Sequence, residues 1–217
     1  MSNVPDPETV LRELSHLLPT VYSSLHYGIF KTKEFFDRQE KEKQKIVNRF
    51  LAPNLVRYYT IQALERKGQV LVPGTYPLDL KAVPNNGICF SYERYDIRIL
   101  KSYNGDLPIP GHSKSRQEFY QQLTLDLNVK DTDENATRAN LLILWEVDPS
   151  YNLQVLSIAC PKAGGRTKES VIAHWHCKVP EEILFGNLTP ESNLKTVEVE
   201  DLPISLNVSA ELTEDAV

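Results

Sequence analysis

The segment Ala139–Val147 constrains the fold most, because it is apolar on both sides of an extended chain. Every second residue from Leu141 faces one side and every second residue from Leu142 faces the other, and both sets stay apolar up to Glu146. A strand with two apolar faces is stable in the middle of a sheet that other layers cover on both sides. The sequence therefore predicts a layered domain built around this strand, with the N-terminal helices as the expected covering layer.

Residues 1–68 carry apolar side chains at helical spacing, which predicts three helices. The first begins at Asp6-Pro7-Glu8, a favourable helix start, and is expected to end at Pro19. The second covers Thr32–Leu51, and its charged middle is typical of a solvent-exposed helix face or, alternatively, of a nucleic-acid-binding helix. The third covers Pro53–Lys67 and is stopped by the glycine that follows it.

From residue 69 onward the spacing of apolar residues changes from helical to alternating, which predicts strands. Besides the central strand, the expected strands are Ile88–Glu93, Tyr95–Lys101, Leu153–Cys160 and Val171–Val179. Ser113 is placed to cap one short helix that reaches about Gln122. We therefore expect an α+β protein in which a helical segment, 1–68, packs on a mainly antiparallel sheet over 69–180 and forms one core with it.

The composition is that of an ordinary globular protein, with 41% hydrophobic and 24% charged residues. No run of residues approaches the ~20 apolar positions that a membrane-spanning helix requires, and the N-terminus carries no secretory signal. The three cysteines, an odd number, fit reduced thiols better than a disulfide framework. We therefore expect a soluble, cytoplasmic protein with no membrane partner.

One basic segment, residues 111–116, is a candidate for binding an anion. A glycine there precedes residues that carry hydrogen-bond donors and positive charge, namely His112, Ser113, Lys114 and Arg116. Backbone N–H groups at a helix start can hold a phosphate or a carboxylate. Bases are unusual at a helix start, since the helix dipole disfavours them, and this favours a binding role. The alternative interpretation is an ordinary capped surface helix.

A second basic segment, Lys162–Lys168, is a glycine-containing loop whose candidate anion contacts are Arg166 and Lys168. The loop does not match the phosphate-binding pattern GxxxxGK[ST], so it cannot be assigned to nucleotide-hydrolysing proteins of that type. Its alternative interpretation is an ordinary connection between two strands.

Two histidines at alternating positions, His174 and His176, are candidate metal ligands, because residues two apart on a strand share a face. A metal site needs at least one more ligand, and Glu146, Asp148 or His112 could supply it. The alternative is that both imidazoles face solvent. The metal interpretation implies a divalent cation as cofactor.

Acidic residues on two neighbouring hairpins suggest a nuclease-like site, in which carboxylates hold Mg²⁺ and a lysine orients water. Asp96 or Glu93 would lie on one hairpin, and Glu146 and Asp148 on the other. The pattern is incomplete, because Lys162 is expected to lie beyond the end of its strand, after a proline. Alternatively, Glu146 would pair with an arginine such as Arg98.

The chain contains no complete catalytic motif, and in particular no GxSxG nucleophile elbow. The leading hypothesis is therefore a non-catalytic binding or regulatory module without a cofactor, which engages an anionic or macromolecular partner through its basic loops. That partner would be a protein or a nucleic acid. The alternative hypothesis is a metal-dependent hydrolase that uses the carboxylates and the His-x-His pair.

The C-terminal segment 181–217 is acidic, with nine acids and one base, which gives it a charge of −8. Because the whole chain has a net charge of −5, residues 1–180 carry +3. A short helix is expected near Glu181–Phe185. After about Asn187 the apolar residues show no sustained period of 2 or 3.6, so this part buries too little surface to offset ~1–2 kcal/mol of ordering entropy per residue. We expect a mostly flexible tail that competes weakly with anions for the basic body.

Deletion of residues 188–217 should leave the melting temperature nearly unchanged and strengthen anion binding at low ionic strength, because the deleted segment is acidic. Thermal unfolding and a binding titration at two salt concentrations measure both effects. A loss of several degrees would show that the tail is structural, and weaker binding would contradict the competitor role.

Overall fold

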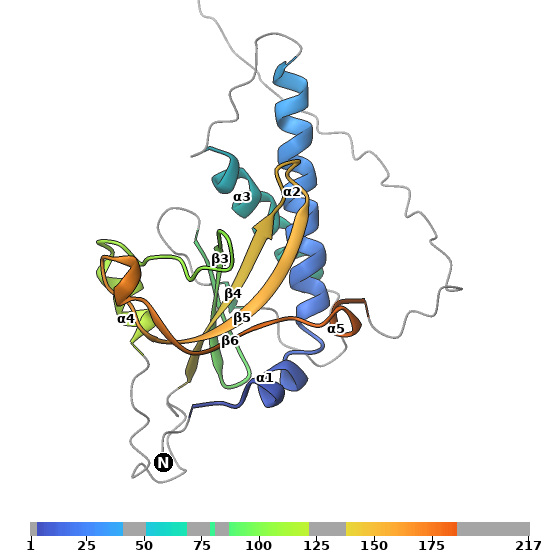
Figure 1. Cartoon of the computed structure of the whole chain (residues 1–217). Coiled ribbons are helices and arrows are strands. Elements are labelled where there is room, and N and C mark those ends of the chain that lie inside the picture. The colour runs from blue at the N-terminus through green and yellow to red at the C-terminus, as the bar shows by residue number, and fades with distance from the viewer. Residues whose placement is uncertain (1–3, 41–50, 69–78, 81–86, 122–137, 186–217) are drawn as a thin grey trace, which may run out of the picture. The chain divides into compact units, whose positions relative to one another are not determined.

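The structure, a computed structural model, describes residues 4–40, 51–68, 79–80, 87–121 and 138–185 (Figure 1). All described helices and strands belong to one compact unit, Met1–Gly186. The fold is α+β, with helices first and a sheet after them, as the sequence predicted. Most of the predicted tail, residues 186–217, lies outside the described residues.

Three helices form the N-terminal part: α1 (Pro7–Glu13), α2 (Leu18–Glu40) and α3 (Leu51–Gly68). The side chain of Asp6 caps α1 by accepting a hydrogen bond from the Thr9 backbone N–H at 3.0 Å. None of the helices in the described part of the chain combines the length and apolar composition that crossing a membrane requires.

The prediction that Pro19 ends a helix was wrong. Pro19 lies in the first turn of α2. Backbone N–H groups in the first turn have no acceptor within the helix, so the lack of an N–H in proline costs no hydrogen bond there. The helix boundary falls before it, between Glu13 and Leu18. The second helix therefore begins well before Thr32, and the end of the predicted Thr32–Leu51 helix, residues 41–50, lies outside the described residues.

The sheet has six strands in the order of the sequence, from β1 to β6. Their bounds are β1 (Asp79–Leu80), β2 (Ile88–Tyr92), β3 (Tyr95–Lys101), β4 (Ala139–Val147), β5 (Leu153–Ala163) and β6 (Ile172–Lys178). Four of the five strand pairs are antiparallel, as predicted, and β3 and β4 are parallel. A parallel pair needs a crossover connection, and α4 (Lys114–Tyr120) lies in it.

Strand β4 is central and covered on both faces, as its sequence predicted. On one face Leu141, Ile143 and Trp145 pack with buried residues of the N-terminal helices. On the other face Leu142, Leu144 and Ala159 pack with Tyr120 of α4. The N-terminal helices therefore form only one of the two covering layers, and α4 lies against the opposite face (Figure 1).

The prediction that Lys162 lies beyond its strand was wrong. Strand β5 continues to Ala163, because register shifts on both sides of Pro161 form an irregularity in its pairing with β6. Such irregularities tolerate proline, which lacks the N–H needed for regular pairing. Lys162 is an exposed residue of β5.

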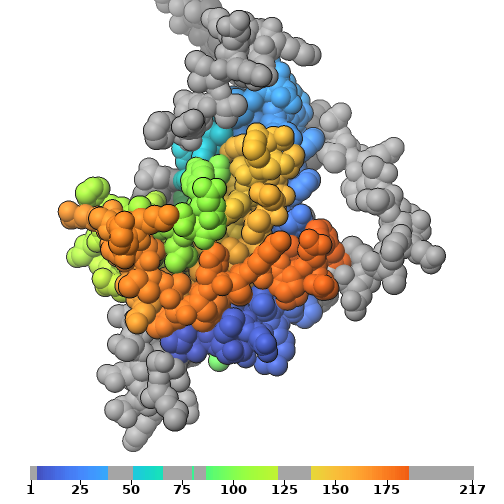
Figure 2. Space-filling view, in the orientation of Figure 1, coloured from blue at the N-terminus to red at the C-terminus, as the bar shows by residue number. Residues whose placement is uncertain are grey.

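The last described elements, β6 and the short helix α5 (Glu181–Phe185), pack against the N-terminal part of the chain. The Trp175 indole N–H donates to the Pro5 carbonyl at 2.7 Å, where Figure 2 shows the orange β6 segment against the dark blue N-terminal segment. Leu184 is buried in the main core, and the rings of Tyr22 and Phe185 meet edge to face at 5.3 Å. The first residues of the predicted tail therefore belong to the core.

Gly28 allows α2 and α3 to approach closely. A Cβ atom at this position would lie 2.4 Å from Thr60 Oγ1 and 2.6 Å from the Val56 carbonyl oxygen. We expect Gly28→Ala to lower the free energy of unfolding by at least about 1 kcal/mol, because overpacking outweighs the gain in helix propensity. Urea denaturation measures the loss. His26→Ala, at an exposed position of the same helix, is the control, and equal stability of both variants would contradict the close approach.

Candidate functional site

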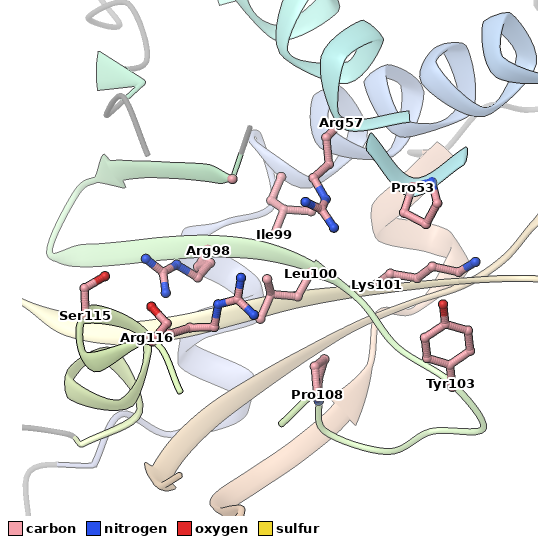
Figure 3. Close-up of a pocket in the computed structure, with 12 residues that line it drawn as sticks. Pro53, Arg57, Arg98, Ile99, Leu100, Lys101, Tyr103, Pro108, Ser115 and Arg116 are labelled. Atoms are coloured by element: carbon pink, nitrogen blue, oxygen red, sulfur yellow. The ribbon is translucent and has the colours of Figure 1, made fainter. Parts of the chain in front are cut away.

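A pocket of about 250 Å³ lies beside β3, between α3 and the start of α4 (Figure 3). Helix α3 contributes Pro53 and Arg57, and the residues around the start of α4 contribute Ser113, Ser115 and Arg116. The remaining lining residues are Gly87, Arg98, Ile99, Leu100, Lys101, Tyr103 and Pro108. Four of the twelve lining residues are cationic and none is acidic.

The sheet itself creates this space. In the described residues the pairing of β2 with β3 begins at Ile88 and Ile99, so β3 runs two residues further, to Lys101. Strand residues alternate between faces, so this short extension presents side chains toward both covering layers. Helix α3 approaches from one layer and α4 from the other, and their arginines line the same pocket beside this end of β3.

Arg98 is the most deeply buried charge of the pocket, with 7% of its surface exposed. Its guanidinium carbon lies 4.8 Å from the centroid of the Phe119 ring, which gives a cation–π contact. Nη1 is buried and has no hydrogen-bond partner, and no described carboxylate forms an ion pair with Arg98. A buried charge without a counter-charge is costly, so this side chain favours an anion in the pocket.

Arg57 and Arg116 add two further guanidinium groups from opposite layers. Figure 3 shows Arg57 reaching from α3 and Arg116 reaching from α4 into the same space beside β3. Arg57 Nη1 donates to Asn54 Oδ1 at 3.2 Å, which orients its side chain. Burial and, secondarily, the charge of Arg116 lower the pKa of Arg57. An anion between the two groups would relieve their repulsion.

Lys101 lines the other end of the pocket, and its ammonium group lies among aromatic rings. Nζ is 4.9 Å from the ring centroid of Tyr103, 5.1 Å from that of Tyr151 and 5.5 Å from that of Trp145. Burial lowers the pKa of Lys101. Figure 3 shows its side chain extending away from the arginines. The pocket therefore has one end lined by arginines and a second end walled by Tyr103 and the Lys101 stem.

Of the anion-binding residues predicted in 111–116, the structure places Ser113 and Arg116 in the pocket. His112 and Lys114 are exposed and do not line it, and Lys114 Nζ lies 3.8 Å from Glu118 Oε1. Helix α4 has only seven residues, and the Ser113 side chain makes no capping hydrogen bond. The site therefore depends on the arginine side chains and not on a helix terminus.

The second predicted segment, Lys162–Lys168, lies outside the pocket. Lys168 Nζ pairs with Asp106 Oδ2 at 2.7 Å, and this hydrogen bond raises the pKa of Lys168. Arg166 is exposed. A Cβ atom on Gly164 would lie 2.5 Å from the Tyr120 ring, so packing against α4 accounts for this glycine. Anion binding by Arg166 and Lys168 remains a prediction.

The histidines predicted as metal ligands point away from the main core. His176 Nε2 lies 2.8 Å from Ser157 Oγ, and burial lowers the pKa of this imidazole. His174 is exposed, and burial, followed by the charge of Lys162, lowers its pKa. In the part of the chain that the structure describes, no three His, Cys, Asp or Glu side chains are grouped so that they could hold a metal ion. Metal binding remains a prediction without added support.

Two of the carboxylates predicted for a nuclease-like site, Glu146 and Asp148, stabilise turns. Glu146 Oε1 accepts from the Gly105 backbone N–H at 2.6 Å and does not pair with Arg98. Asp148 accepts from the backbone N–H and side-chain amide of Asn152 at 2.8 and 2.9 Å, and these bonds lower its pKa. Both carboxylates therefore have structural partners.

The sequence analysis missed Arg57, Lys101 and Ser115 as site residues, and it considered Arg98 only as a partner for a carboxylate. One local signal could have identified Arg98: it is a charge flanked by Ile97 and Ile99 in a strand beside the central one. Arg57 carries no such signal, because a charged residue on a helix is ordinary.

Arg98→Met should leave the free energy of unfolding unchanged or increase it, because it removes a buried charge that lacks an internal counter-charge and keeps a stem against Phe119. Arg94→Met, which removes an exposed ion pair with Glu13 at 2.9 Å, is the control and should cost about 0–1 kcal/mol. Chemical denaturation measures both. A loss of about 3 kcal/mol or more for Arg98→Met would mean that Arg98 has a structural partner.

Comparison of the chain with protein-family models, with curated proteins and with solved structures found no match. The function therefore has to be argued from the pocket.

Proposed function

We propose that this chain is an anion-binding module whose site is the pocket formed by Arg57, Arg98 and Arg116. The observation that carries the proposal is the buried, unpartnered Nη1 of Arg98 in a pocket without acidic lining residues. Guanidinium groups bind oxyanions through pairs of parallel N–H donors. Three such groups approaching from three elements suit a tetrahedral, multiply charged oxyanion such as phosphate better than a planar carboxylate with one charge.

Binding is favoured over catalysis by the kinds of residue that line the pocket. The described lining residues provide donors and positive charge, with no carboxylate or imidazole that could act as a general base beside Ser113 or Ser115. The size of the pocket suits a small molecule or one phosphorylated group of a larger partner. Cys89, Cys160 and Cys177 are all thiols, which supports a reducing compartment such as the cytoplasm as the place of action.

The proposal predicts binding of pyrophosphate and, more weakly, of inorganic phosphate, measured by isothermal titration calorimetry on the full chain at low salt. Arg98→Met and Arg116→Met should each weaken binding about 10- to 100-fold, since a charge-assisted hydrogen bond contributes about 1.5–3 kcal/mol. Lys114→Met is the matched control, because Lys114 is a neighbouring exposed base outside the pocket. Binding that is unchanged in Arg98→Met, or lost equally in Lys114→Met, would contradict a site in the pocket.

A further inference from the structure

Tyr103 is an aromatic side chain that is exposed and yet lines the pocket. Its exposed fraction is 63%, among the largest of the described hydrophobic residues. One face of the ring lies toward Lys101 Nζ at 4.9 Å. Single exposed aromatic residues are common on protein surfaces, but this one forms a wall of a cavity whose other end holds the three arginines.

The backbone that carries Tyr103 is held in one conformation. Asn104 and Gly105 have φ of 53° and 74°, and they form a tight turn that brings Tyr103 opposite Asp106. Two other segments contact this turn, since Glu146 accepts from Gly105 and Lys168 pairs with Asp106. Within the loop itself, Ser102 Oγ donates to the Asp106 carbonyl at 2.6 Å. A ring held in this way loses little conformational freedom when a ligand covers it.

The pocket is larger than one oxyanion requires. The pocket has a volume of about 250 Å³, and one water molecule needs about 10–15 Å³ of such space. The pocket could therefore hold many water molecules, whereas a phosphate group, with its five heavy atoms, would fill only part of it. Beyond the arginines, the walls include Pro53, Leu100 and Tyr103, which are apolar or aromatic, and the stem of Lys101. A ligand that fills the cavity therefore carries an organic group beside its anion.

We infer that the ligand is a phosphate monoester that carries a flat ring, with the phosphate on Arg57, Arg98 and Arg116 and the ring on Tyr103. The inference rests on the proposed function and names its ligand class. Two sources share this chemistry: a nucleoside monophosphate and an aryl phosphate. Stacking of a base on an aromatic side chain should strengthen binding about 5- to 100-fold over the same phosphate without the ring.

The test compares four probes on the full chain by calorimetry: inorganic phosphate, ribose 5-phosphate, adenosine monophosphate and phenyl phosphate. We expect at least one ring-bearing probe to bind about 5-fold or more tightly than ribose 5-phosphate. Tyr103→Leu should remove this gain and leave the affinity for inorganic phosphate within about 2-fold, whereas Tyr103→Phe should retain the gain. Tyr58→Leu is the matched control, because Tyr58 is exposed but does not line the pocket.

The outcomes separate this inference from the proposed function. If ribose 5-phosphate binds as tightly as both ring-bearing probes, or if Tyr103→Leu keeps the gain, the role of the ring is wrong and the phosphate site stands. If no phosphate probe binds to the wild type, the proposed function fails as well. If an oligonucleotide without terminal phosphates binds more tightly than adenosine monophosphate, the ligand is a nucleic-acid strand and not a phosphate monoester. The ratio of adenosine monophosphate to phenyl phosphate affinity distinguishes the two sources.

Discussion

The parallel pairing of β3 with β4 determines how the rest of the molecule is arranged. Parallel neighbours cannot be joined by a tight turn, so the chain crosses from the end of β3 to the start of β4 by a long connection. That connection carries α4, whose Tyr120 covers the second apolar face of β4. The same connection brings Phe119 onto Arg98 and Arg116 into the pocket. The strand pairing thus produces the second core layer and the candidate site together.

Arg98 differs in its partners from the paired surface charges of the described residues. Glu13 with Arg94, Lys168 with Asp106 and Lys114 with Glu118 are paired at the surface, where each pair contributes little to stability. Arg98 is buried, and the Phe119 ring compensates part of its desolvation, about 2 kcal/mol for a dehydrated cation–π contact. The ring carries no net negative charge, so the desolvation of Arg98 is compensated only in part.

Local patterns predicted the secondary structure well because each depends on neighbouring residues. The two apolar faces of Ala139–Val147 gave the bounds of β4, and the alternation on either side of Arg94 gave the β2–β3 hairpin. The errors arose where one residue has two structural meanings. Proline can stop a helix, but it is also favourable in the first turn of one, which is the position of Pro19. Proline usually ends a strand, but an irregularity in the strand pairing accommodates Pro161.

The candidate site was less accessible to sequence reasoning, because its residues meet only through long-range topology. Arg57 and Arg116 are separated by 58 positions, and only Arg116 stands in a local basic pattern. Glu146, which was predicted for a catalytic set, and Lys168, which was predicted as an anion contact, both bind the turn that carries Tyr103. Charge type alone therefore does not distinguish a functional group from a structural one. The distinction lies in whether the fold supplies a partner: it does for Glu146 and Lys168, and it supplies none for the buried Nη1 of Arg98.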